Sequence, residues 1–138
     1  MSVTSAITPQ HLVHDVFDAN GRKPPFAYSS GLAARPGHAY ELAVTGLPGR
    51  WAQGVINGAA EQLVADGLEP AEGLELDNVL RGGFLVRLRR VADTSQCTRA
   101  LLLGGPDVPV WQILVPDRWG FFPGNPRYSE DPAAQPLM

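Results

Sequence analysis

The sequence has little of what marks secreted, membrane and nucleic-acid-binding proteins. It has 138 residues and a single cysteine, Cys97, which excludes an internal disulfide framework. Secreted domains of this size more often carry several paired cysteines, so we expect a cytoplasmic protein. No apolar run approaches the roughly 18 residues that cross a membrane. The first residues show no basic segment followed by an apolar core, so we expect no signal peptide. A net charge of −3 argues against a general nucleic-acid binder.

The motifs that bind metals and nucleotide cofactors are missing as well. There is no Cys-x-x-Cys and no His-Glu-x-x-His, and the three histidines are His11, His14 and His38. On a strand His11 and His14 point to opposite faces, so they cannot chelate one ion together. The glycine turns GLPGRW and RGGF match neither a P-loop nor a Gly-x-Gly-x-x-Gly fingerprint. We therefore expect neither a metal nor a cofactor. Flavin binding stays an alternative that rests on architecture alone.

Glycine and proline are abundant, and they separate segments with regular apolar patterns. The 15 glycines and 13 prolines make up about a fifth of the chain, against an average of about 12%. Alternating or wholly apolar runs predict five strands, at residues 11–17, 26–32, 40–47, 84–92 and 108–116. Helical spacing predicts one helix over residues 50–66, and a capping signal predicts a shorter helix over about 95–103. The pattern predicts an α+β domain in the order β-β-β-α-β-α-β, with a mostly antiparallel sheet and both helices on one face.

The length and the C-terminal composition predict one domain followed by a tail. A chain of this size forms one domain, which we place at residues 1–126. We expect residues 127–138 to be a flexible tail, because SEDPAAQPLM is polar and rich in proline. From Pro116 onward the chain is rich in proline and aromatic residues. Such a stretch can close a pocket as a lid, dock on a second subunit, or fill the end of the core with Trp119 and Phe121.

Three segments in the same order resemble a known family. FAYSSGL, PGHAYELAVTGLP and VWQILVPDRWGFFP resemble the uncharacterised bacterial family "domain of unknown function 4262", which typically reads PPFAYT-GL, GHPEL, GLP and Q-L-WPD-G-FP. The likeness runs over residues 10–126. The family's motif positions correspond here to Tyr28, Gly31, His38, Glu41, Gln112 and Asp117. The chain departs from the pattern at Ser29, at an extra residue between the histidine and the glutamate, and at Val115. The resemblance implies a shared fold and no known reaction.

The first two of these segments concentrate groups that can transfer protons. Tyr28, Ser29 and Ser30 lie on one predicted strand, Glu41 lies on its hairpin partner, and His38 lies in the connecting loop. His38 can act as a base with Tyr28 or a serine as proton donor, and Ser-His-Glu can also be a nucleophilic triad. A Gly-x-Ser-x-Gly elbow is absent, which weakens the hydrolase version. The alternative is structural: the histidine orients the turn, the tyrosine is a core residue and the serines are small packing residues.

The last segment supplies four candidates for ligand binding. Gln112 is the strongly polar side chain in a strand that is otherwise apolar on both faces. A buried amide must find hydrogen-bond partners or lose about 1–3 kcal/mol. It either points into a pocket or bonds the backbone of a neighbouring loop. Its neighbour Trp111, and Asp117 and Trp119 of the aromatic stretch, complete the predicted ligand-binding set.

Two functions fit these features. The first is a small stand-alone cytoplasmic enzyme that performs metal-free acid–base or hydroxyl chemistry on a small organic or peptide substrate. The alternative is a non-catalytic accessory module that binds a ligand or a partner protein. The cluster of Tyr, Ser, His and Glu favours the enzyme, and the absence of a complete catalytic signature favours the module. In both cases we expect a small-molecule or peptide ligand, no nucleic acid and no membrane, and a homodimer stays open.

Overall fold

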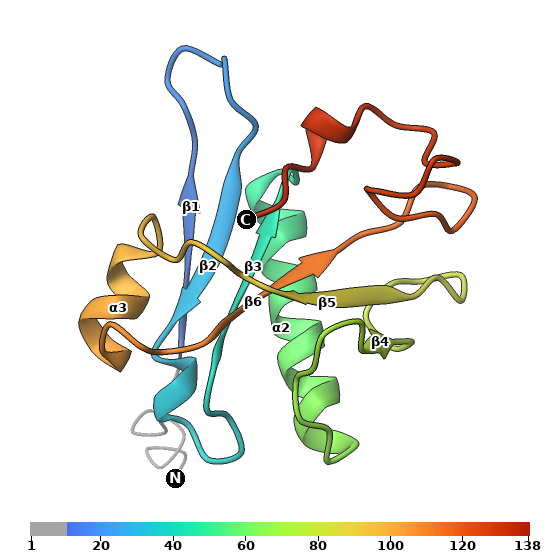
Figure 1. The fold of residues 1–138 in the computed structure, drawn as a ribbon. Helices are drawn as coiled ribbons and strands as arrows, with labels where there is room; N and C mark the ends of the chain where they lie inside the picture. Colours follow the sequence, from blue (N-terminus) through green and yellow to red (C-terminus); the bar gives the residue numbers. More distant parts are fainter. Residues whose placement is uncertain (1–10) are drawn as a thin grey trace, which may run out of the picture.

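Within residues 11–138, the part of the chain that the computed structural model describes, six strands form one sheet (Figure 1). The strands are β1 (Leu12–Val16), β2 (Phe26–Ser30), β3 (Glu41–Thr45), β4 (Glu75–Leu76), β5 (Val86–Arg90) and β6 (Val110–Leu114). They lie side by side in the order β1-β2-β3-β6-β5-β4. The central pair β3–β6 is parallel, and every other neighbouring pair of this sheet is antiparallel. The prediction of an α+β fold with a mostly antiparallel sheet is confirmed.

The two α-helices of the described residues cover opposite faces of the sheet. They are α2 (Gly49–Ala65) and α3 (Thr98–Gly104). Leu42 and Val44 of β3 pack in the core beneath α2, whereas Ala43 between them packs with Tyr28 and Ala100 on the side of α3. Figure 1 shows α2 behind the sheet, while the chain from β5 to α3 passes in front of it. The expectation of both helices on one face is therefore wrong. Every residue of β3 is buried, and a central strand in a parallel pair needs cover on both faces.

The helix α2 forms as its periodicity predicts. Pro48 precedes its first residue, and Gly67, with φ +63°, follows its C-cap. Proline suits a helix start and a left-handed glycine suits its end. The buried apolar face consists of Ala52, Val55, Ile56, Ala59, Ala60 and Leu63. The strand β4 was not predicted, because a two-residue strand in an acidic loop leaves no periodicity to detect. Among the helices of residues 11–138, none has both the length and the apolar character that a membrane crossing requires.

The end of the chain lies against the sheet. Two short 3-10 helices complete the described elements: η1 (Leu32–Ala34) and η2 (Pro132–Ala134). After η2, Gln135 is buried and its side chain bonds both the N–H (2.7 Å) and the C=O (2.8 Å) of Val115. The N–H of Met138 donates to Gln112 Oε1 at 2.8 Å. Side chains of the core thus bond the last residues of the chain, and the flexibility expected of residues 127–138 stays a prediction.

Candidate functional site

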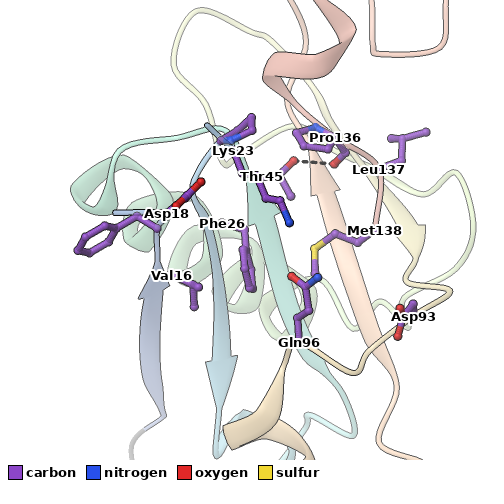
Figure 2. A pocket seen from close by; sticks show the side chains of 12 residues that line it. Val16, Asp18, Lys23, Phe26, Thr45, Asp93, Gln96, Pro136, Leu137 and Met138 are labelled. Carbon is purple, nitrogen blue, oxygen red and sulfur yellow. Dashed lines mark hydrogen bonds between the residues drawn. The ribbon is translucent and has the colours of Figure 1, made fainter. Parts of the chain in front are cut away.

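A cleft of about 770 Å³ opens on the α3 face of the sheet. We call it the hairpin cleft, because the β1–β2 hairpin forms one wall. The loop before α3 forms the second wall, and the last three residues of the chain form the third. Figure 2 shows Phe26 on one side of the space, Gln96 and Met138 facing each other on the other side, and Lys23 above. The lining is mostly apolar, with a small number of polar side chains, as in sites that bind small molecules.

The hairpin turn positions the cationic side of this cleft. Asp18 accepts hydrogen bonds from the backbone N–H groups of Asn20 (3.0 Å) and Arg22 (3.2 Å). Gly21 in the same turn has φ +67°, a conformation that favours glycine. The turn is thus closed by a side chain that mimics the backbone, and it places Lys23 directly after it. The Asp18 carboxylate is thus bonded to the backbone of the turn, and no ion pair joins it to Lys23.

The ammonium group of Lys23 is the cation of a lining that also holds the carboxylates of Asp18 and Asp93. Figure 2 shows its side chain extending from the rim into the space between Phe26 and Met138. Within residues 11–138 there is one ion pair, between Arg87 and Glu75 at 2.9 Å. Lys23 therefore forms no ion pair with a described residue. Asp93 on the opposite rim accepts from the N–H of Ser95 at 3.0 Å, and the hydrogen bonds from Ser95 lower the pKa of that carboxyl. Residues 1–10 contain no acidic side chain.

Gln112 holds the wall that the chain end forms. This side chain is fully buried, and its Nε2 donates to Thr45 Oγ1 (3.1 Å) and to the carbonyl of Pro136 (2.9 Å). Its Oε1 accepts from the N–H of Met138. The amide therefore bonds the backbone of a neighbouring segment, the second of the two roles considered for it. That segment supplies residues of the hairpin cleft, so Gln112 acts on the cleft through what it positions.

Tyr28 holds the opposite wall. It is buried, and its hydroxyl accepts the backbone N–H of Arg99 at 3.1 Å, with Thr98 Oγ1 3.5 Å away. The first N–H groups of a helix lack partners within the helix, so this contact caps α3 and fixes the loop before it. The Tyr28 ring also stacks on Phe26 at a centroid separation of 6.1 Å. Tyr28 and Gln112, both predicted to touch a substrate or ligand, therefore lie outside the lining and position the residues that form it.

Ser29 and Glu41 are brought together, as the hairpin prediction implies. Ser29 Oγ donates to Glu41 Oε1 at 2.6 Å and accepts the N–H of Leu42 at 3.0 Å. The carboxylate also accepts the N–H groups of Leu32 (3.2 Å) and Ala33 (2.8 Å), at the start of η1. Burial raises the pKa of Glu41, and these hydrogen bonds oppose the shift. Both side chains are almost completely inaccessible to solvent, so their visible role is to join β2, β3 and η1.

His38 lies apart from this pair. Its Nε2 donates to the carbonyl of Ala60 on α2 at 3.3 Å, and its ring meets the edge of Tyr40 at 5.5 Å. Burial lowers the pKa of His38. Ser30 pairs instead with His14, whose Nε2 is 2.6 Å from the serine hydroxyl. Four of the five residues predicted as catalytic are thus distributed over three separate hydrogen-bonded groups, those of Tyr28, of Ser29–Glu41 and of Ser30–His14. The fifth, His38, bonds the Ala60 carbonyl instead.

The aromatic stretch after β6 forms its own structure outside the hairpin cleft. Asp117 accepts the N–H groups of Trp119 (2.9 Å), Phe121 (2.8 Å) and Ser129 (2.7 Å). Burial raises the pKa of Asp117, but these hydrogen bonds outweigh it and hold the pKa below its usual value. Trp119 is 69% exposed, and Trp111 lies beneath the guanidinium of Arg90. None of the three predicted ligand-binding residues Trp111, Asp117 and Trp119 belongs to the lining of the hairpin cleft.

The residues that do line this cleft were missed by sequence reasoning. Lys23 has one local signal: it directly precedes Pro24 and Pro25, which extend the chain into β2. The closing Pro-Leu-Met of the chain is the apolar end of a polar stretch, and that contrast is the signal for docking. Gln96 has none, because it comes from an exposed loop whose place against the hairpin depends on the whole fold.

Comparison with known proteins gives a family and no relative of known activity. No curated protein and no solved structure matches the chain. The model of the family described as "Domain of unknown function (DUF4262)" matches residues 8–129. That range contains the motif residues Tyr28, His38, Glu41, Gln112 and Asp117, which carried the resemblance in the sequence. The protein therefore belongs to the DUF4262 family of domains of unknown function.

Proposed function

We propose that the protein binds a small amphiphilic molecule in the hairpin cleft. The ligand places an anionic group at the Lys23 ammonium and an apolar body against Phe26 and Met138. The observation that carries the proposal is the Lys23 ammonium, which is in no ion pair within residues 11–138 and extends into a cleft whose surface is mostly apolar. This function is that of a non-catalytic accessory module, the second of the two functions that fit the sequence, and the hairpin cleft is its proposed site. The cytoplasmic location expected from the single cysteine is part of the same proposal.

The size and chemistry of the cleft support a ligand of this kind. A volume of about 770 Å³ lies within the roughly 300–1,000 Å³ typical of small-molecule sites. Apolar surface removed from water contributes about 25 cal/mol per Å², so an apolar body supplies affinity. A charge-assisted hydrogen bond to the ammonium supplies orientation. Opposite charges on protein and ligand also raise the association rate at low salt.

Calorimetric titration with decanoate tests the proposal, with decanol as an uncharged probe of the same length. We expect saturable binding of decanoate that Lys23→Gln weakens at least fivefold, while decanol binding changes little. Arg22→Gln is the matched control, because it removes a positive charge from the same turn but not from the lining. Equal affinity of the wild-type protein and Lys23→Gln for decanoate would contradict the assigned site.

A second function, the enzyme, is favoured by one specific contact. Ser30 Oγ and His14 Nε2 are 2.6 Å apart, the spacing of a nucleophile and its base. Burial and the nearby Arg99 lower the pKa of His14, so the imidazole is neutral and able to accept a proton at pH 7. In this reaction the serine oxygen attacks an acyl carbon while His14 takes its proton. The proton then passes to the leaving alcohol or amine, and water releases the acyl group. Because Ser30 is 2% exposed, His14 must move before a substrate reaches it.

Labelling with a fluorophosphonate probe tests this second function. An activated Ser30 forms a covalent adduct that mass spectrometry maps to this residue, and His14→Gln abolishes it. The control is Ser95→Ala, which removes an exposed hydroxyl and leaves labelling unchanged. A wild-type protein that stays unlabelled under conditions that label a serine hydrolase excludes nucleophilic catalysis by Ser30, and leaves ligand binding in the hairpin cleft untouched.

A further inference from the structure

A second cleft, of about 800 Å³, shares no lining residue with the hairpin cleft. It lies between the start of β1, the loop after η1 and one side of α2. Leu12, Pro36 and Val64 contribute apolar surface to it. Its polar side chains include His11, Arg35, Asn57 and Glu61. We call it the Arg35 cleft.

Three of these polar side chains form a hydrogen-bonded chain with a defined direction. Arg35 Nη1 is 2.7 Å from His11 Nδ1, and His11 Nε2 is 2.6 Å from Asn57 Oδ1. A guanidinium group can only donate, so Nδ1 must accept and Nε2 must carry the ring proton. Nε2 therefore donates to the amide oxygen of Asn57. The histidine is fixed as one neutral tautomer between two partners of known polarity.

This direction determines which groups remain for a ligand. With Oδ1 of Asn57 occupied, the free end of that amide is its NH2 group, which donates. The guanidinium of Arg35 uses one donor on His11 and keeps its other N–H groups. Arg35 is half-buried and takes part in no ion pair within residues 11–138, and residues 1–10 contain no acid that could supply one. Arg35 and Asn57 thus present donors and a positive charge to the cleft.

The acidic residue of the cleft does not cancel this charge. Glu61 lies in the exposed part of α2, one turn after Asn57, and solvent screens its carboxylate. Arg35 follows η1, where its N–H donates to the Leu32 carbonyl at 2.9 Å, and Pro36 comes next. The position of its side chain is therefore set by a short helix, by a proline and by His11 together.

We propose that the Arg35 cleft binds an organic oxyanion, a carboxylate or a phosphate ester, independently of the hairpin cleft. The guanidinium fork takes two oxygens of the anion, and the Asn57 amide donates to a second polar group of the ligand. The apolar lining takes the organic part. The volume of the cleft exceeds that of a bare phosphate or carboxylate group, which is why an organic ligand fits it better.

Titration of the 15N-labelled protein with three probes of one shape tests this inference. Benzoate carries a carboxylate, phenyl phosphate carries a phosphate ester, and benzyl alcohol carries no charge. We expect a saturable shift of the Arg35 Nε–H and Asn57 side-chain NH2 signals with one or both anions, and none with benzyl alcohol. The anion that binds more tightly identifies the ligand class. All titrations are run at one ionic strength.

Variants decide whether the binding belongs to this cleft. Arg35→Gln should weaken binding at least tenfold, and Asn57→Ala should weaken it less. Arg22→Gln, in the β1–β2 turn and outside the lining of this cleft, should leave binding unchanged. If Arg35→Gln does not fold, Arg35→Lys replaces it, because lysine keeps the charge and loses the fork. The proposal is overturned by the absence of saturation with both anions, by equal binding of benzyl alcohol, or by variants at Arg35 and Asn57 that bind like the wild type.

Discussion

Gln112, in the central strand β6, donates its side-chain N–H to the carbonyl of Pro136, 24 residues further along the chain. The side-chain oxygen of Gln112, Oε1, accepts a hydrogen bond from the N–H of Met138. A polar residue in the middle of the core is thereby the anchor of the chain end. Together with Thr45, which also donates to the Pro136 carbonyl, this side chain holds one wall of the hairpin cleft.

Replacing Gln112 by leucine should release the chain end. The substitution keeps the volume but takes the acceptor from the Met138 N–H and one of two donors from the Pro136 carbonyl, which keeps the Thr45 hydroxyl. An unpaired buried group costs about 1–3 kcal/mol. We expect a lower free energy of unfolding in urea and faster proteolytic cleavage after residue 129. Gln53→Leu, at an exposed position of α2, is the control and should change neither. A stable variant with a protease-resistant C-terminus would show that the anchor lies elsewhere.

Replacing Tyr28 by phenylalanine should loosen the start of α3 locally. The N–H of Arg99 loses its acceptor, and a lost hydrogen bond of this kind costs about 0.5–1.5 kcal/mol. Hydrogen exchange should accelerate in residues 98–101 and stay unchanged in α2, which has no contact with the hydroxyl. Uniform exchange rates across both helices, equal to those of the wild type, would remove Tyr28 from this role.

Replacing Glu41 by glutamine should change how stability depends on pH. Burial raises the pKa of Glu41 above its ordinary value of 4.5, so the folded state holds this proton more tightly than the unfolded state. The favourable contribution of the group is complete below pH 4.5 and is lost as the pH rises through the folded-state value. Glutamine does not titrate. The stability of the wild type relative to Glu41→Gln should therefore fall between pH 4.5 and neutrality, as measured by urea unfolding. A difference that rises with pH would mean that the pKa is lowered.

Cys97 should be unreactive in the folded protein. The thiol is fully buried, and burial, with the nearby Asp93 and Glu41, raises its pKa to about 11. Thiolate is the reactive form, so Ellman's reagent at pH 8 should modify the native protein far more slowly than the urea-unfolded protein. Stoichiometric modification of the native protein at the unfolded rate would show that α3 opens readily.

Local patterns predicted the strands and the long helix, but not the faces that they present. In YELAVTGL, the alternation sets Tyr40, Leu42 and Val44 on one face and Glu41, Ala43 and Thr45 on the other. The second face is buried as well, because α3 and the chain end cover it. Period-two alternation indicates which residues share a face, and it carries no information on what later segments pack there. That is why the predicted fold class is confirmed and the helix placement is wrong.

The candidate site also contains one part that the sequence could predict and one part that it could not. Ser29 and Glu41 could be paired from the sequence because they lie on neighbouring strands of a short hairpin. His38 could not, since the direction of its loop is set by α2, where it meets the Ala60 carbonyl. The hairpin cleft combines side chains from four parts of the chain, the β1–β2 hairpin, β3, the loop before α3 and the chain end, that no local pattern connects. Such a site becomes visible only when the long-range pairing is known.

The parallel pairing of β3 with β6 has a consequence for how the protein folds. On either side of this pair the sheet is built from antiparallel partners, whereas β3 and β6 join residues about 70 positions apart, such as Glu41 and Val110. Closing so long a loop is entropically unfavourable, and topologies of high contact order fold slowly. The hairpin can form early by local contacts, but it faces the α3 loop and the chain end only after this closure. The hairpin cleft is therefore completed late in folding, and a ligand of the proposed kind would report that both halves of the sheet have joined.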